Sequence, residues 1–153
     1  EVYFPFFDKP VGAQPVDWGV LDTHVIDLID NLALKAITNT NYRMAAREFN
    51  QAIRILEDIS WLETWTQLVY YKMGDCLFQS PQTLQEAVKY FTLTRQISPG
   101  FNDPVFFLGQ IARYTVHIPE AERYFRHCQK NPPQWIPGCA KEIEEFFRDL
   151  KKR

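Results

Sequence analysis

The sequence has no long hydrophobic run, since no stretch of its 153 residues approaches the roughly 18 apolar residues that are typical of a transmembrane helix. It also has no excess of one charge, because 17 Lys and Arg stand against 19 Asp and Glu, for a net charge of -2. A nearly neutral chain offers little electrostatic attraction to nucleic acid or to an anionic membrane. We therefore expect neither a nucleic-acid partner nor insertion into a membrane.

Paired cysteines are absent as well. The three cysteines, Cys76, Cys128 and Cys139, are odd in number and show no C-x-x-C spacing. Free thiols, mostly buried, are therefore expected instead of a disulfide framework. Unpaired thiols slightly favour a reducing compartment, but the sequence does not identify the compartment.

Motifs that carry catalytic chemistry are also missing. His24, His117 and His127 have no metal-type spacing with each other or with the cysteines. The sequence contains no glycine-rich phosphate loop, no nucleophile elbow and no H-E-x-x-H motif. We predict no enzyme activity, no metal site and no cofactor.

A repeated pattern is present. The segment "EAERYFRHCQKNPP" aligns without a gap to "EAVKYFTLTRQISP" upstream, and "AAREFNQAIRILE" matches further back. Each copy places a small residue, then an aromatic residue four positions later, then a small residue three positions after that: Ala45, Phe49, Ala52; Ala87, Phe91, Thr94; Ala121, Phe125, Cys128. At this spacing Cys128 is interpreted as a core residue and not as a nucleophile.

The pattern resembles the tetratricopeptide repeat, a 34-residue helix–turn–helix unit. We expect repeats over about 26–59, 67–100 and 102–135, followed by a capping helix in residues 139–153, all within a domain that spans 20–153. The resemblance implies an all-α fold, a right-handed α-solenoid of three helical hairpins plus the cap. Close approach of two helices explains the small residues, since Ala33, Gly74 and Gly109 are expected to face the alanines of the second helices.

Periodicity and turn residues predict helices over about 22–38, 42–59, 61–78, 83–97, 104–115, 119–130 and 139–152, with a turn at 39–42. Asp103 is predicted to be an N-cap that precedes Pro104. In the capping helix, Ala140, Ile143, Phe147 and Leu150 form the expected apolar stripe.

The first nineteen residues differ from the rest. Residues 1–19, "EVYFPFFDKPVGAQPVDWG", are rich in aromatic residues and proline, which predicts an extended arm that lies against something. We expect it to dock on this domain, on another copy as a homo-oligomer contact, or on a further domain. The hypothesis places residues 2–7 near Tyr71, Phe78, Phe106 and Tyr114.

The resemblance also implies a concave groove lined by the first helix of each repeat. The positions predicted to bind a partner are apolar and aromatic with an acidic edge: Leu34, Trp65, Leu68, Tyr71, Asp75, Phe78, Phe106, Gln110, Arg113 and Tyr114. Trp61 and Trp65 either cover the join between repeats or form an aromatic ledge for a partner. The positions that hold a terminal carboxylate in family members that bind chaperone tails are Asp30, Leu34, Lys72, Asp103 and Phe107 here, and only one of them is basic.

The predicted function is therefore non-catalytic protein–protein interaction, as a scaffold, adaptor or assembly factor that binds a peptide or helix in the groove. A carboxylate clamp is absent, so an acidic C-terminal tail is not the expected partner. The alternative is a structural or self-association segment of a larger repeat protein.

Overall fold

A computed structural model of the chain describes residues 23–62 and 65–153, with side chains from residue 27 onward. The described residues form α-helices and one short 3-10 helix: α1 Thr23–Ala45, α2 Phe49–Ile59, α3 Thr66–Phe78, η2 Pro81–Thr83, α4 Leu84–Ile97, α5 Asp103–Tyr114, α6 Ile118–Lys130 and α7 Cys139–Lys151. No strand occurs in this part of the chain. The expected all-α fold is confirmed, whereas the predicted N-terminal arm lies outside the described residues.

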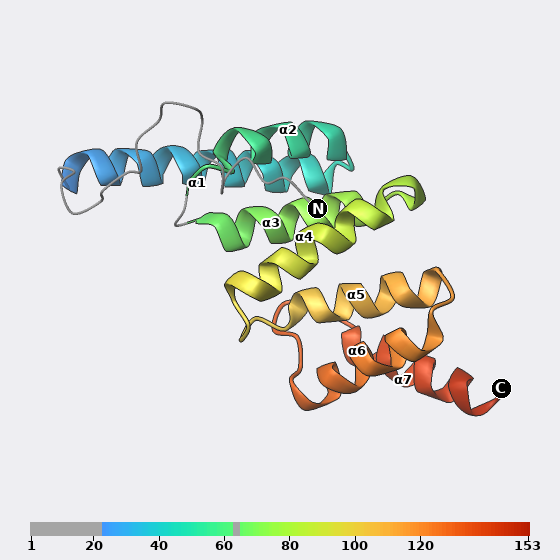
Figure 1. Cartoon of the computed structure of the whole chain (residues 1–153). Coiled ribbons are helices and arrows are strands. Elements are labelled where there is room, and N and C mark those ends of the chain that lie inside the picture. Colours follow the sequence, from blue (N-terminus) through green and yellow to red (C-terminus); the bar gives the residue numbers. More distant parts are fainter. Residues whose placement is uncertain (1–22, 63–64) are drawn as a thin grey trace.

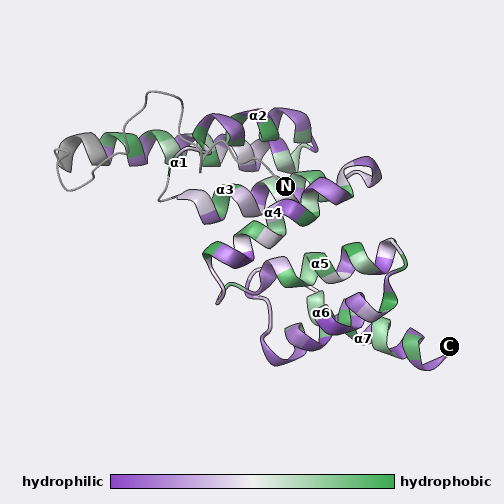
Figure 2. Ribbon diagram, in the orientation of Figure 1, coloured by the Kyte–Doolittle hydropathy of each residue, from purple (hydrophilic) through white to green (hydrophobic). Residues whose placement is uncertain are grey.

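Each helix packs mainly against its neighbours along the chain. Figure 1 shows three antiparallel pairs, α1 with α2, α3 with α4, and α5 with α6, which follow one another through the molecule, with α7 at the C-terminal end. The hydrophobic core runs through these pairs as three clusters of buried side chains. In Figure 2, α5 is largely hydrophobic along its length, whereas α6 is largely hydrophilic on the side drawn. The α5 helix thus lies between α4 and α6 and packs against both.

Phenylalanine rings explain the glycines of the second and third pairs. A Cβ atom added to Gly74 would lie 2.6 Å from Cε1 of Phe91, and one added to Gly109 would lie 2.6 Å from Cε1 of Phe125. Both phenylalanines are fully buried. The glycine therefore makes room for the ring of the partner helix, which is a closer constraint than the glycine–alanine approach that the sequence suggested.

The predicted turn at residues 39–42 is wrong, because α1 continues to Ala45. The hydroxyls of Thr38 and Thr40 bond to the backbone oxygens of Leu34 and Ala36, one turn earlier, so these residues are satisfied within the helix. The chain turns only at residues 46–48, where Arg47 has a φ of 61°.

The repeat pattern of the first pair lies seven residues later than predicted. Ala52 and Leu56 are fully buried, as Ala121 and Phe125 are, whereas Ala45 is exposed. The backbone agrees, since Arg47 and Val116 each lie five residues before the buried alanine with φ values of 61° and 60°.

The same turn geometry recurs in the hydrogen bonds. The backbone N–H of Glu48 bonds to the oxygen of Arg43, and that of His117 bonds to the oxygen of Ala112. In this frame the glycine position of the first pair is held by buried Thr40, and the phenylalanine position is held by Leu56. The predicted frame was misleading because this pair has neither the glycine nor the phenylalanine.

Three further expectations need correction. The predicted helix over 61–78 begins only at Thr66, and Trp61 lies in the turn after α2, with its Nε1 donating to the oxygen of Asp58 at 2.9 Å. Asp103 is not the N-cap but lies in the first turn of α5. Its buried carboxylate accepts the backbone N–H groups of Gln134 at 2.7 Å and Trp135 at 2.9 Å, and so holds the loop before α7.

The apolar stripe of α7 also differs from the expected one. Ile143 and Phe146 are buried, whereas Ala140 is exposed, and Phe147 and Leu150 are half-buried. The ring of Phe146 lies 4.9 Å from that of Phe125, centroid to centroid. The helix therefore covers the third pair through Phe146, a residue that the sequence analysis left out.

Candidate functional site

The centre of the candidate surface is a stripe along α3. Tyr71, Asp75 and Phe78 follow each other at steps of four and three, so they share one face of the helix. All three are half-buried, whereas Tyr70, Met73 and Leu77 on the opposite side are buried in the core. The stripe is thus the edge of α3 that remains partly open.

Aromatic rings connect this stripe to α5. We call Tyr71, Phe78, Phe101, Phe107 and Tyr114 the aromatic cluster. Measured between ring centroids, Tyr71 lies 5.0 Å from Phe101 and 5.9 Å from Phe107, and Phe78 lies 5.1 Å from Phe107. All three are edge-on contacts. Phe78 and Tyr114 are stacked at 6.0 Å with an interplanar angle of 29°. Since Tyr114 is 57% exposed, the cluster reaches the surface at this ring.

Asp75 is the charged member of the stripe. Burial raises the pKa of its carboxyl group, an effect that the Gln79 side chain and the charge of Lys72 reduce. Gln79 Nε2 donates to Asp75 Oδ1 at 3.0 Å. Burial also lowers the pKa of Lys72, whose Nζ donates to Asn41 Oδ1 on α1. The lysine is thus directed toward α1, away from the aromatic side of the stripe.

Tyr71 lies between two acidic groups. Burial raises the pKa of its hydroxyl, and the carboxylates of Asp103 and Asp75 raise it further. The hydroxyl therefore stays protonated and is available as a hydrogen-bond donor at any physiological pH.

The α1 side of the surface is more open. Leu34 is 54% exposed, and Trp65 Nε1 donates to Asp30 Oδ1 on α1 at a long 3.4 Å. Trp65 and Leu68 are half-buried and pack against the core of the first two pairs. Trp65 thus covers the join between the pairs, while Trp61, 53% exposed, lies in a separate turn, so the two tryptophans do not form one helical ledge.

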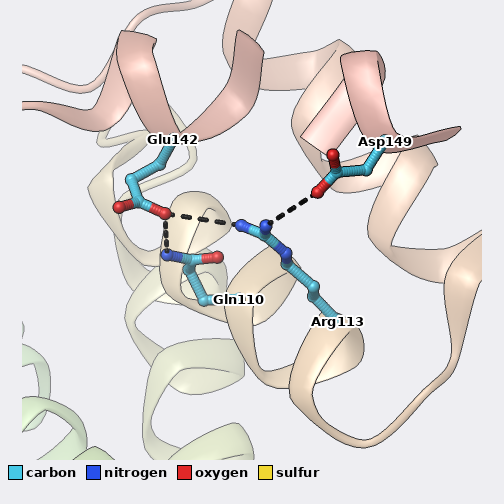
Figure 3. Close-up of polar contacts among 4 residues, drawn as sticks. All are labelled: Gln110, Arg113, Glu142 and Asp149. Atoms are coloured by element: carbon cyan, nitrogen blue, oxygen red, sulfur yellow. Dashed lines mark hydrogen bonds and ion pairs between the residues drawn. The ribbon is translucent and has the colours of Figure 1, made fainter. Parts of the chain in front are cut away.

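Three predicted positions lie against α7, and two of them are buried. Phe106 and Gln110 are each only 5% exposed, and Phe106 packs in the same cluster as Phe146. Figure 3 shows Arg113 between two carboxylates of α7, 3.4 Å from Glu142 and 3.8 Å from Asp149.

Glu142 also accepts Gln110 Nε2 at 3.5 Å (Figure 3). The C-terminal helix therefore occupies the α5 surface that the repeat alignment had assigned to a partner. The exposed part of the candidate surface is displaced toward α3 and α1.

Sequence reasoning missed Asn41 and the buried Phe101 as neighbours of this surface, and it considered Phe107 only as a carboxylate-clamp position. Phe107 follows Phe106, and the helical frame alone does not show which of two adjacent aromatic residues is covered by α7. Asn41 was assigned to a turn. In the corrected frame it is the residue of the first pair that is equivalent to Asp75 of the second pair.

One cavity, about 420 Å³, lies between α4, α5 and α6, with Leu84, Val88 and Ile111 among its lining. Another, about 310 Å³, lies between the end of α5, the start of α6 and the end of α7, and Tyr114 of the aromatic cluster is among its lining. A cavity of about 240 Å³ lies beside Cys128 and Cys139. Burial raises the pKa of the Cys128 thiol to about 12, so the thiol in this last cavity is a poor nucleophile.

Within residues 23–62 and 65–153 the chain brings together no group of three or more His, Cys, Asp or Glu side chains that could hold a metal ion. None of the helices in this part of the chain combines the length and apolar character that a membrane crossing requires.

Comparison with known proteins supports the fold. No protein-family model matches the chain, and no curated protein matches it. Among solved structures, a chain of the "CopN-Scc3 complex" is similar, with a TM-score of 0.64 over 94% of this chain and 84% of that chain. At 15% sequence identity this likeness shows a shared all-helical fold.

Proposed function

We propose that the chain is a non-catalytic protein-interaction module built from three tetratricopeptide-like repeats arranged as a right-handed solenoid with α7 as its cap. Packing of each helix against its chain neighbours supports this arrangement. The second and third repeats keep their expected bounds, 67–100 and 102–135. The first is better placed at about 33–66, because Thr40, Ala52 and Leu56 then take the positions of Gly109, Ala121 and Phe125.

The observation that carries the proposal is the aromatic cluster, which continues from α3 to α5 and emerges at Tyr114. Partly exposed aromatic side chains held by their neighbours are typical anchors of protein interfaces, because they bury a large area at a small cost in conformational entropy. The similar chain belongs to a structure that, by its name, is a complex of two proteins. A peptide or helix of another protein is therefore the proposed partner.

The proposal is tested with variants that place a charge on the surface. Leu34→Glu and Tyr114→Glu alter two exposed apolar side chains, and Thr92→Glu places the same charge on the exposed face of α4 as a control. Proteins that copurify with the chain from its native source are identified by mass spectrometry. A partner retained by Thr92→Glu and lost by both other variants would support the proposed surface, whereas a partner retained by all three would refute it.

The second candidate is a segment of a larger repeat protein. Leu28 and Leu32, one helical turn apart on α1, are both more than half exposed. Two exposed leucines on the first helix are where a preceding hairpin or a second copy would pack. Light scattering of the chain and of a Leu28→Glu/Leu32→Glu variant tests self-association, which is expected to be lost in the variant.

A further inference from the structure

The further inference concerns the chemistry of the partner at Asp75, and it rests on the proposed function. The Asp75 carboxylate lies on the α3 stripe one turn from Tyr71 and one turn from Phe78. Phe78 is stacked with Tyr114, which is more than half exposed. A half-buried carboxylate thus shares a face of α3 with two rings of the aromatic cluster, one of which is stacked on the exposed ring of Tyr114.

Both components attract a cation. The faces of aromatic rings carry negative potential and bind ammonium or guanidinium groups, and a carboxylate adds a full negative charge. An arginine fits best, because its planar guanidinium stacks on a ring while its N–H groups bond to a carboxylate. An anionic partner group would meet Asp75 and, beyond Tyr71, the carboxylate of Asp103.

The charge of Asp75 is only partly compensated by its own surroundings. Gln79 supplies one neutral hydrogen bond to Oδ1. Lys72, the nearest cation on α3, donates to Asn41, and within residues 27–62 and 65–153 no ion pair within 4.0 Å reaches Asp75. The raised pKa of Asp75 has burial as its largest cause, so its charged form is less stable here than in water. A cation that approached from the partner would restore the lost stabilisation.

We propose that Asp75, between Tyr71 and Phe78, receives an arginine or lysine side chain of the partner, so that the surface selects a basic residue flanked by apolar ones. The competing interpretation is that Asp75 serves only to fix Gln79 at the end of α3. That role predicts that Asp75→Asn leaves any discrimination between a charged and a neutral ligand unchanged.

Two synthetic peptides decide between these interpretations. One is acetyl-Leu-Phe-Arg-Phe-Leu-amide, and the other carries citrulline, the neutral analogue of nearly the same shape, in place of arginine. Each is titrated into the full chain labelled with ¹⁵N, and amide shifts give the site and the Kd. We expect shifts in α3 and in the second half of α5, and a Kd that is roughly fivefold lower for the arginine peptide, the size of one exposed cation–π contact plus one exposed ion pair.

The Asp75→Asn variant is expected to reduce the difference to roughly twofold, because it removes the ion pair, keeps the shape of the side chain and leaves the cation–π contact in place. Asp58→Asn, which removes an exposed carboxylate on α2, is the matched control and should keep the fivefold difference. Equal affinities on the unaltered chain, no binding of either peptide, or an undiminished difference in Asp75→Asn would each overturn the proposal. If Asp75→Asn failed to fold, the comparison of the two peptides on the unaltered chain would decide alone.

Failure of this inference can be told apart from failure of the proposed function. A partner that is lost by Leu34→Glu and Tyr114→Glu but retained by Asp75→Asn would keep the interaction surface and remove only its preference for a basic residue. A partner unaffected by all of these variants would remove both.

Discussion

The sharpest test of the packing is the substitution Gly109→Ala. The added methyl group would lie 2.6 Å from Cε1 and 2.8 Å from Cδ1 of Phe125, well inside van der Waals contact. Phe125 is fully buried, and the centroid of its ring lies 6.0 Å from that of Phe106 and 4.9 Å from that of Phe146, so two large side chains limit its movement. Overpacking of this kind costs about 1–3 kcal/mol.

Helix propensity acts in the opposite direction. Alanine is favoured over glycine in a helix interior by about 1 kcal/mol. Because the clash involves a fully buried ring, we expect overpacking to dominate and the free energy of unfolding of Gly109→Ala to fall by about 1–2 kcal/mol. On propensity alone the variant would be more stable than the parent, so even the sign of the change is informative.

The first pair suggests a compensating change. There the glycine position is held by Thr40 and the phenylalanine position by Leu56, both fully buried. Phe125→Leu alone should destabilise by about 1–2 kcal/mol through lost packing. In Gly109→Ala/Phe125→Leu, the smaller leucine side chain leaves room for the methyl group. The double variant should therefore be about 1 kcal/mol more stable than the sum of the two single effects predicts.

Urea denaturation followed by tryptophan fluorescence measures these free energies. Gly100→Ala is the matched control, because a Cβ at this loop position meets nothing within 4 Å, and its effect should stay within about 0.5 kcal/mol. The reasoning is refuted if Gly109→Ala is as stable as the parent, or if the two changes are simply additive.

Four further predictions follow from other parts of the molecule. Asp103→Ala should destabilise by about 2–4 kcal/mol, because two charge-assisted hydrogen bonds to the loop before α7 are lost, whereas exposed Asp58→Ala should have little effect in the same urea assay. Val116→Gly should raise the melting temperature, since this exposed β-branched residue has a φ of 60°; an unchanged temperature would contradict that conformation. Burial raises the thiol pKa values of Cys76 and Cys128 to about 12, so at pH 8 only half-buried Cys139 should react readily with a disulfide reagent until the chain is unfolded. Deleting residues 139–153 should expose Phe106 and Phe125 and cause aggregation; a monomeric product of unchanged stability would show that α7 is dispensable.

The helices of the second and third pairs could be predicted because their signals are local. Prolines lie in the first turn of α5 and α6, and the glycine, alanine and phenylalanine positions recur with the spacing of the packed helices. The expected ranges 83–97, 104–115 and 119–130 differ from α4, α5 and α6 by a single residue at each end where they differ. The limited space between each glycine and the phenylalanine ring packed on it restricts the residue types at these positions, so the pattern can be recognised in the sequence.

The first pair could not be placed in the same way. Thr40 and Leu56 fill the contact that glycine and phenylalanine fill elsewhere, so the volume is conserved while the residue types are not. Asn39 and Asn41 resemble turn residues, but the threonines of the same segment bond back into the helix, and Asn41 accepts a bond from Lys72 on α3. A contact with another helix thus overrides the local preference.

The accessible surface could not be predicted from local sequence signals either, because it depends on the path of the chain after α6. Asp103, expected to cap its own helix, instead binds backbone N–H groups more than thirty residues away and sets the direction of the loop that leads to α7. The helix then covers Phe106 and Gln110 and forms ion pairs with Arg113, and these three residues occupy positions in α5 equivalent to those of Tyr71, Asp75 and Phe78 in α3.

Specificity should therefore depend on α3 of the second pair more than on α5 of the third. The Asp75 position has Gln110 as its equivalent in α5, and that amide is already bonded to Glu142 of α7, whereas Asp75 lies at a partly open edge. The equivalent position thus bonds to the protein's own helix in one pair and remains partly open in the other. It follows that loosening α7, by removing Glu142 and Asp149 as partners of Arg113, should extend the binding surface toward Gln110 without altering the contact at Asp75.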